Sequence, residues 1–149
     1  MTSKEHAARV TEGRKAPARR MRVLIADDHA GYRAGMVRLI GEHPQLQVAG
    51  EAADGREALA AIVALQPDVA LLDVLMPGLT GLDVCRRLRA DASAPRTHVV
   101  LITGAPDRTL AAQAAAAGAV ALLAKETPPL MICAQLVAAG DGRVGWSVE

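Results

Sequence analysis

Residues 69–78 read VALLDVLMPG, four apolar residues followed by an aspartate, and this stretch decides the fold. An unbroken apolar run such as 69–72 is typical of a central parallel strand, because helices cover both faces of that strand and neither face meets water. Asp73 is therefore expected at the carboxyl end of a buried strand. Open parallel sheets place their ligand sites beyond those ends.

Short apolar runs and helical patterns alternate on both sides of this strand. We expect further strands at 23–26, 47–50, 98–102 and 120–123. Apolar residues recur at helical spacing in the segments between and after them, which are 32–40, 56–65, 82–88, 110–117 and 130–137. Since parallel strands need crossover connections, five such units predict the α/β class, with a parallel sheet between two layers of helices.

Length and charge divide the chain into a body and a basic extension. At 149 residues and 51% hydrophobic content, the chain can bury one sizeable core, and we expect one domain over 21–139. Six basic and two acidic residues give 1–20 a charge of +4, which leaves −3 for the rest, since the net charge is +1. Because 1–20 lacks apolar periodicity, we expect it to be disordered, with nucleic-acid or membrane contact as the less favoured alternative.

Neither a secretion signal nor a membrane span is expected. The chain does not open with an apolar signal region, and its longest apolar stretch, 110–124, is too short to cross a bilayer. We therefore expect a cytoplasmic protein without a membrane partner. Cys85 and Cys133 lie far apart in predicted helices, and we interpret them as buried reduced thiols.

Reactive side chains follow four of the five predicted strands. They are Asp27, Asp28, Asp73, Thr103 and Lys125. Neighbouring carboxylates raise each other's pKa unless a cation lies between them, and oxygen ligands without histidine suit Mg²⁺. Lys125 would add a positive charge for a phosphate group. Each residue alone has an ordinary alternative as a helix cap, a strand residue or a solvated lysine, so only their convergence argues for a site.

His29 follows these carboxylates directly. No second histidine lies at ligand spacing, so we expect His29 to open the first helix and not to bind metal.

Four motifs resemble the response-regulator receiver domains of two-component signalling, in particular the NarL/LuxR-type subfamily. The motifs are VLIADDH at 23–29, DVLMPG at 73–78 with TGL at 80–82, ITG at 102–104, and LAK at 123–125. The likeness to the subfamily lies in the early Asp27-Asp28-His29 combined with the late KETPP at 125–129. The resemblance covers 21 to about 139 and implies a flavodoxin-like, doubly wound sheet with strand order 2-1-3-4-5.

The resemblance also implies a role for each residue of the site. Asp73 would be the phosphoacceptor, and its carboxylate, that of Asp28 and the backbone carbonyl of Leu75 would bind Mg²⁺ directly. Asp27 would reach the ion through water. Lys125 would pair with Asp73 before transfer and with the phosphoryl oxygens afterwards. The phosphodonor would be a phosphohistidine on a sensor histidine kinase.

Thr103 would have a switch role. Its hydroxyl would donate to a phosphoryl oxygen and draw the loop after the fourth strand toward the site. Gly104 would leave room for this approach. Many relatives carry an aromatic residue three positions before the lysine, where this chain has Leu122. The readout of phosphorylation is therefore expected to differ from the usual aromatic one. The face formed by 110–117, 120–123 and 130–137 would control a homodimer or contact with an output domain.

The subfamily usually consists of transcription factors that bind DNA through a C-terminal helix-turn-helix domain. Residues 140–149 resemble the start of a linker to such a domain, which this chain does not include. We expect the receiver part of a longer regulator that reaches DNA only through that output domain. A stand-alone single-domain regulator is the alternative.

Three other functions fit part of the pattern. A hydrolase with an aspartyl-phosphate intermediate also needs a strand-end aspartate, but haloacid-dehalogenase-like enzymes carry a second one two residues later, where this chain has Leu75. A nucleotide-binding domain needs a glycine-rich phosphate loop that the sequence lacks. A receiver-like scaffold that works without phosphorylation stays open because of Leu122. We expect no enzyme activity beyond slow self-dephosphorylation.

Overall fold

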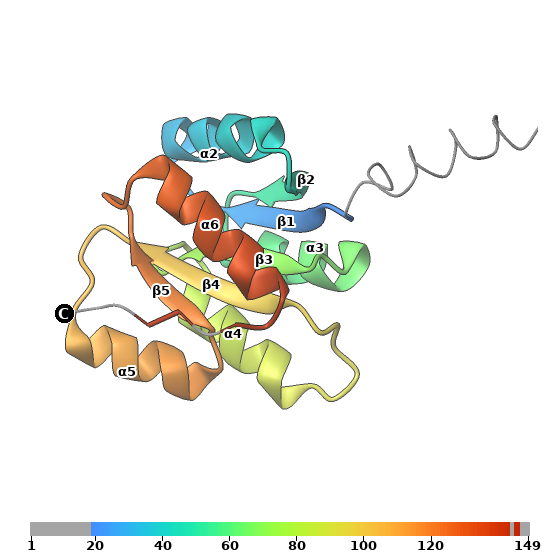
Figure 1. Ribbon diagram of the computed structural model, residues 1–149. Helices are drawn as coiled ribbons and strands as arrows, with labels where there is room; N and C mark the ends of the chain where they lie inside the picture. Colours follow the sequence, from blue (N-terminus) through green and yellow to red (C-terminus); the bar gives the residue numbers. More distant parts are fainter. Residues whose placement is uncertain (1–18, 144, 147–149) are drawn as a thin grey trace, which may run out of the picture.

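The structure, a computed structural model, describes residues 19–143 and 145–146. Its five strands form one parallel sheet in the order β2-β1-β3-β4-β5, and a helix follows each strand along the chain (Figure 1). The expected α/β class and strand order are confirmed. Most of the basic extension, 1–18, lies outside the described residues, as do 144 and 147–149 of the expected linker.

All ten predicted elements are present. The strands are Met21–Ala26 (β1), Leu46–Ala52 (β2), Val69–Asp73 (β3), His98–Thr103 (β4) and Ala121–Ala124 (β5). The helices are Ala30–Glu42 (α2), Gly55–Leu65 (α3), Gly81–Ala90 (α4), Arg108–Ala117 (α5) and Pro129–Gly140 (α6). None of the described helices is long and apolar enough to cross a membrane. The last strand begins one residue later than expected, although the Val120 N–H already donates to the Val99 carbonyl at 2.8 Å.

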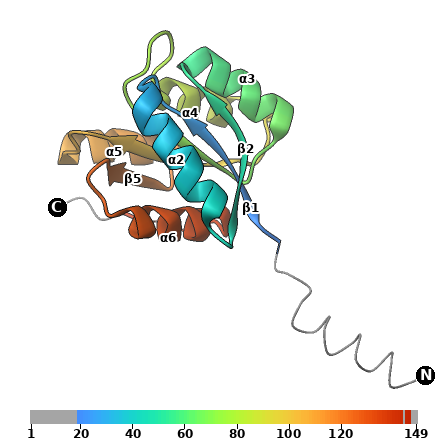
Figure 2. The same ribbon diagram turned by 90° about the horizontal axis from the view of Figure 1, so that it is seen from above.

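Helices α2 and α6 cover one face of the sheet, and α3, α4 and α5 cover the other (Figure 2). Alternate strand residues enter two separate apolar clusters, one on each face. In β3, for example, Ala70 and Leu72 pack toward α3, α4 and α5, whereas Val69 and Leu71 pack toward α2 and α6. All five residues of β3 are buried, which confirms the central strand expected there. This two-sided burial of an aliphatic core stabilises the sheet.

Strand register brings the reactive residues to one edge of the sheet. Ala26 of β1 pairs with Leu72 of β3, so the residues that follow them, Asp27 and Asp73, come side by side. On the other side, Thr103 of β4 pairs with Ala124 of β5. The next residue, Lys125, donates its N–H to the Thr103 carbonyl at 2.8 Å.

Helix caps fix the loops that leave this edge. The Nδ1 atom of His29 accepts the Tyr32 N–H at 3.0 Å, which confirms that His29 opens α2. At the start of α4, Thr80 and Asp83 form a capping box, each side chain accepting the backbone N–H of the other residue.

Both cysteines are free and buried, as expected. The Cys85 thiol donates to the Ala117 carbonyl at 3.2 Å, and burial raises its pKa to about 11. A thiol with so high a pKa is almost entirely protonated near neutral pH and is therefore a poor nucleophile.

The chain returns to the sheet after α6. The Gly145 N–H donates to the Val120 carbonyl at 2.8 Å, and Gly145 forms an isolated parallel bridge with Ala121 at the edge of β5. Part of the segment expected to begin a linker therefore contacts the domain at this point.

Candidate functional site

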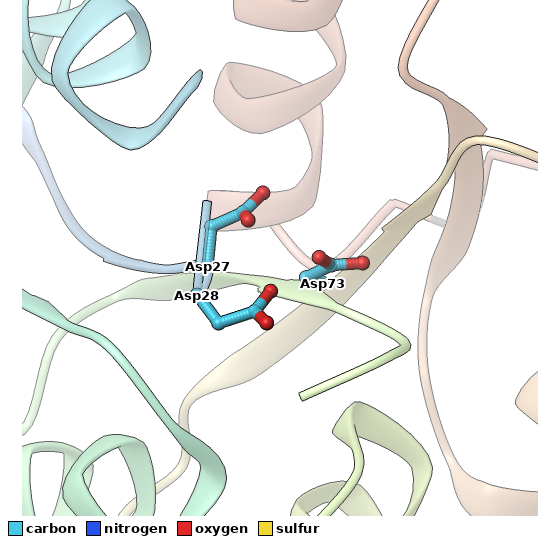
Figure 3. A group of neighbouring side chains, drawn as sticks. All are labelled: Asp27, Asp28 and Asp73. Atoms are coloured by element: carbon cyan, nitrogen blue, oxygen red, sulfur yellow. The ribbon is translucent and has the colours of Figure 1, made fainter. Parts of the chain in front are cut away.

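Three carboxylates gather where β1 and β3 end (Figure 3). Asp27, Asp28 and Asp73 each offer one oxygen, and these oxygens all lie within 4.8 Å of one another. Asp27 and Asp73 are only 2% and 6% exposed, whereas Asp28 is exposed. The cluster is therefore buried on one side and open to solvent on the other.

Asp27 is held in place by the first turn of α2. Its Oδ1 atom accepts the His29 N–H at 2.8 Å, and its backbone carbonyl accepts a hydrogen bond from the Arg33 guanidinium at 2.6 Å. Its Oδ2 atom forms an ion pair with the Lys125 ammonium at 2.7 Å. The orientation of this carboxylate is thus fixed by contacts with the start of α2 and with Lys125.

Lys125 bridges the two buried carboxylates. Its Nζ atom lies 3.1 Å from Asp73 Oδ2, in addition to its contact with Asp27, and 4.5 Å from the centroid of the Tyr32 ring. Burial disfavours the charge of the ammonium, but the contacts with Asp27 and Asp73 outweigh burial and raise the Lys125 pKa above its ordinary value. Lys125 is therefore a cation that the two carboxylates hold in its charged form.

The contacts of Asp73 offset its negative charge only in part. Burial and the neighbouring charge of Asp27 raise the pKa of Asp73 above its ordinary value, although Lys125 and the Leu75 N–H act in the opposite direction. The Leu75 N–H donates to Asp73 Oδ1 at 3.2 Å. Three carboxylates and one ammonium leave an excess of negative charge, and all three carboxylates offer the hard oxygen ligands that Mg²⁺ prefers.

Thr103 lies at the same edge, at the end of the neighbouring strand β4. It is 4% exposed, and its Oγ1 atom accepts the Ala105 N–H at 3.2 Å. Because a hydroxyl both accepts and donates, its own hydrogen is still available for another acceptor. A Cβ atom at Gly104 would meet nothing within 4 Å, so the loop has open space there.

Leu122, at the position where many relatives carry an aromatic residue, is a core residue. It is 1% exposed and packs in the apolar cluster beneath α4 and α5, together with Cys85 and Ala117. Its side chain points to the α4–α5 face of β5, so it is enclosed within the core.

The sequence analysis missed Tyr32. Its spacing from Met36 and Ile40 reads as an ordinary apolar helix face, and the ring indeed packs on the α2–α6 side of the core. The signal that could have revealed it is its position, because Tyr32 lies in the first turn of a helix that begins at the carboxylate cluster.

Residues 23–136 match the family model of the response regulator receiver domain. The chain belongs to this family. Receiver domains are the modules through which two-component response regulators act with histidine kinases, and the expected family is thereby confirmed.

Relatives of this receiver domain belong to response regulators of different kinds. A protein-glutamate methylesterase/protein-glutamine glutaminase of Myxococcus xanthus is 44% identical over 107 residues, which are 72% of this chain and 30% of that protein. The DNA-binding transcriptional activator DevR/DosR of Mycobacterium tuberculosis is 33% identical over 123 residues, or 83% of this chain and 56% of the activator. The chain thus spans between about a third and just over half of these relatives.

A solved structure supports the same conclusion. The signal receiver domain of NarL from Mycobacterium tuberculosis is 36% identical, has a TM-score of 0.80, and is covered completely by 85% of this chain. The likeness to regulators of the NarL/LuxR type is therefore confirmed, as is the flavodoxin-like order of the strands.

Proposed function

We propose that Asp73 accepts a phosphoryl group from a phosphohistidine of a sensor histidine kinase, and that the aspartyl phosphate switches the conformation of the domain. One observation carries the proposal, namely that Asp73 Oδ2 lies 3.1 Å from the Lys125 ammonium at the edge of the sheet where two further carboxylates meet. A nucleophilic carboxylate, a cation for the phosphoryl oxygens and a set of metal ligands thus lie together.

The residues fit a Mg²⁺ ion. Asp28, Asp73 and the Leu75 backbone carbonyl would bind it directly, and Asp27 would bind it through water. The support is the excess negative charge of the cluster, in which burial and the proximity of Asp27 both raise the pKa of Asp73. When bound, the ion supplies positive charge that offsets the charge of the phosphoryl oxygens.

The transfer itself needs little beyond positioning and charge. A carboxylate oxygen of Asp73 attacks the phosphorus in line and forms the new O–P bond. The P–N bond of the phosphohistidine breaks, and its electron pair stays on the imidazole nitrogen. Lys125 then interacts with the phosphoryl oxygens, which carry the charge that the Asp73 carboxylate carried before.

The conformational response would start at Thr103. Its free hydroxyl hydrogen would bind a phosphoryl oxygen and draw 104–107 toward Asp73, biasing a two-state equilibrium of α5, β5 and α6. That face would then control a homodimer or contact with a DNA-binding output domain that lies outside this chain. The relatives that are DNA-binding regulators support transcriptional output and, with it, a cytoplasmic location.

We propose 21–139 as the receiver domain, preceded by a basic extension at 1–20 and followed by the start of a linker at 140–149. A stand-alone regulator, as an alternative, would use the same site. The buried Leu122 favours one further candidate, a receiver-like scaffold that binds partners without phosphorylation, because it supplies no aromatic readout. For the phosphorylated receiver we propose no catalysis of its own beyond slow self-dephosphorylation.

The first prediction tests the acceptor directly. Incubation with acetyl phosphate and Mg²⁺ is expected to add one phosphoryl group, detected by intact mass, to the wild type and none to Asp73→Asn or to a sample with chelator. Asp83→Asn is the matched control, because Asp83 is an aspartate of the α4 cap and not of the cluster, and it should be phosphorylated like the wild type. A folded wild type that gains no adduct would favour the scaffold instead.

A further inference from the structure

Tyr32 touches the site but has no part in the mechanism above. It is the only tyrosine of the chain, and its ring faces the same ammonium that bridges Asp27 and Asp73. The ring centroid lies 4.5 Å from Lys125 Nζ, well within the distance at which the negative face of an aromatic ring attracts a cation. Lys125 therefore has three partners, two carboxylates and one ring.

The ring is held by the same turn of α2 that holds Asp27. Tyr32 donates its N–H to His29 Nδ1 at 3.0 Å, and the adjacent Arg33 bonds the Asp27 carbonyl at 2.6 Å. The Tyr32 side chain also packs against the apolar cluster beneath α2 and α6. Its position relative to the carboxylates is thus fixed by backbone contacts on one side and by core packing on the other.

Ring and carboxylates differ in how they depend on phosphorylation. The attraction of Asp27 and Asp73 for the ammonium changes when Asp73 becomes an ester and when other cations compete for the carboxylates. The face of the ring carries no titratable charge and keeps its attraction throughout. Of the three described contacts of the Lys125 ammonium, the contact with the ring is the one that does not depend on the charge state of the site.

We propose that Tyr32 is a positioning residue of the phosphorylation site, whose ring holds the Lys125 ammonium beside Asp73. The inference rests on the proposed function, since it assigns Tyr32 a part in the same transfer. The ring and not the hydroxyl has this part. The hydroxyl oxygen is buried and has no hydrogen-bond partner among the described residues, so Tyr32→Phe removes no protein hydrogen bond.

The test compares two substitutions that distinguish the effect of the aromatic face from the effect of apolar side-chain volume. Tyr32→Phe keeps the aromatic face, whereas Tyr32→Leu keeps an apolar side chain on α2 and removes that face. With acetyl phosphate and Mg²⁺, we expect Tyr32→Phe to be phosphorylated at about the wild-type rate and Tyr32→Leu roughly 2- to 30-fold more slowly, the range that corresponds to cation–π interactions. Val37→Ala, which thins the same core cluster away from Lys125, should keep the wild-type rate.

Two readouts distinguish positioning from a merely structural role. The side-chain methylene protons of Lys125 should show an upfield ring-current shift by NMR in the wild type and Tyr32→Phe, and this shift should vanish in Tyr32→Leu. In a double-mutant cycle, Tyr32→Leu should have no further effect on the rate once Lys125 is replaced by alanine.

The outcomes separate this inference from the proposed function. A wild type without an adduct overturns the proposed function. A wild type that gains the adduct while Tyr32→Leu matches Tyr32→Phe in rate overturns the role of Tyr32 alone. So does a Lys125 NMR shift that is unchanged in Tyr32→Leu.

Discussion

At the scale of single residues, the charge of Asp73 is unfavourable for the fold. Burial and Asp27 raise its pKa, so the folded protein binds the proton of Asp73 more tightly than the unfolded chain does. The ionised carboxylate therefore destabilises the folded state at neutral pH, and this destabilisation disappears as the pH falls through the raised pKa. Under the proposed function, this loss of folding stability accompanies a carboxylate that accepts the phosphoryl group.

Asp73→Asn is therefore expected to raise the Tm of the metal-free protein at neutral pH, by roughly 4 °C if the change in the free energy of unfolding is about 1 kcal/mol. Thermal unfolding followed by circular dichroism at several pH values checks this, and the gain should shrink toward acid pH. An equal gain at every pH would mean that the charge of Asp73 is not its cause.

Asp83 gives the opposite sign and serves as the control. The backbone and hydroxyl groups of Thr80 hold the pKa of Asp83 below its ordinary value, so its contribution is present above the unfolded pKa and is lost as the pH falls through the folded one. Asp83→Asn should lower stability at neutral pH by roughly 0.3–1 kcal/mol, the range for a carboxylate in the exposed first turn of a helix.

Some residue contacts follow from the sequence and others do not. The gathering of Asp27, Asp28 and Asp73 was predictable, because the carboxyl ends of neighbouring parallel strands meet at one edge. The shorter contact of Lys125, which lies 2.7 Å from Asp27, could not be predicted from the sequence. No sequence pattern tells which of two adjacent carboxylates a long side chain reaches. The contact between Lys125 and the Tyr32 ring likewise depends on how α2 packs over the edge of the sheet.

At the scale of elements, two helices end with left-handed residues of different kinds. Gln66 after α3 has a φ of 49°, and Gly118 after α5 has a φ of 98°. A left-handed conformation suits glycine and strains glutamine. Pro67 accounts for the end of α3 at this point, because a proline disfavours the right-handed helical conformation in the residue before it, whatever that residue is.

Gln66→Gly should therefore raise the free energy of unfolding by about 0.5–1 kcal/mol, because relief of strain exceeds the added freedom of the unfolded chain. Gly118→Ala should lower it by at least 1 kcal/mol, since the new Cβ meets the Arg89 side chain as well as a positive φ. Urea unfolding of the three proteins checks both signs. A stabilised Gly118→Ala, or a destabilised Gln66→Gly, would contradict this account of the two helix ends.

The order and type of the elements could be predicted because apolar periodicity is local to each segment. The Gly118 cap was predictable for the same reason, since glycine itself is the signal. The left-handed Gln66 was not, because its residue type gives no sign of it. The contact between Gly145 and β5 was equally hidden, since it joins residues that are neighbours only after the chain has folded.

At the scale of the whole molecule, the order of the strands places the region proposed to respond to phosphorylation near β5, at one end of the sheet, and α3 near β2, at the other end. Thr103 ends β4, next to β5, and Lys125 follows β5, so a change at the site reaches the chain between them first. Helix α3 packs on β1 and β2, which lie at the opposite end of the strand order from β5. Movement of 103–125 can therefore occur while α3 keeps its contacts.

With beryllofluoride and Mg²⁺ as a phosphoryl mimic, amide hydrogen exchange should slow in 103–125 by about 5- to 150-fold, the range of ordinary allosteric couplings, and stay unchanged in α3. Thr103→Val, which keeps the shape of the side chain and removes the hydroxyl, should bind the mimic but lose most of this protection, because the loop then has no hydrogen bond to the site. Equal exchange of 103–125 with and without the mimic in a wild type that binds it would show that phosphorylation is not read out through this side of the sheet. An unchanged response in Thr103→Val would instead assign the coupling to Lys125, whose backbone is already bonded to β4.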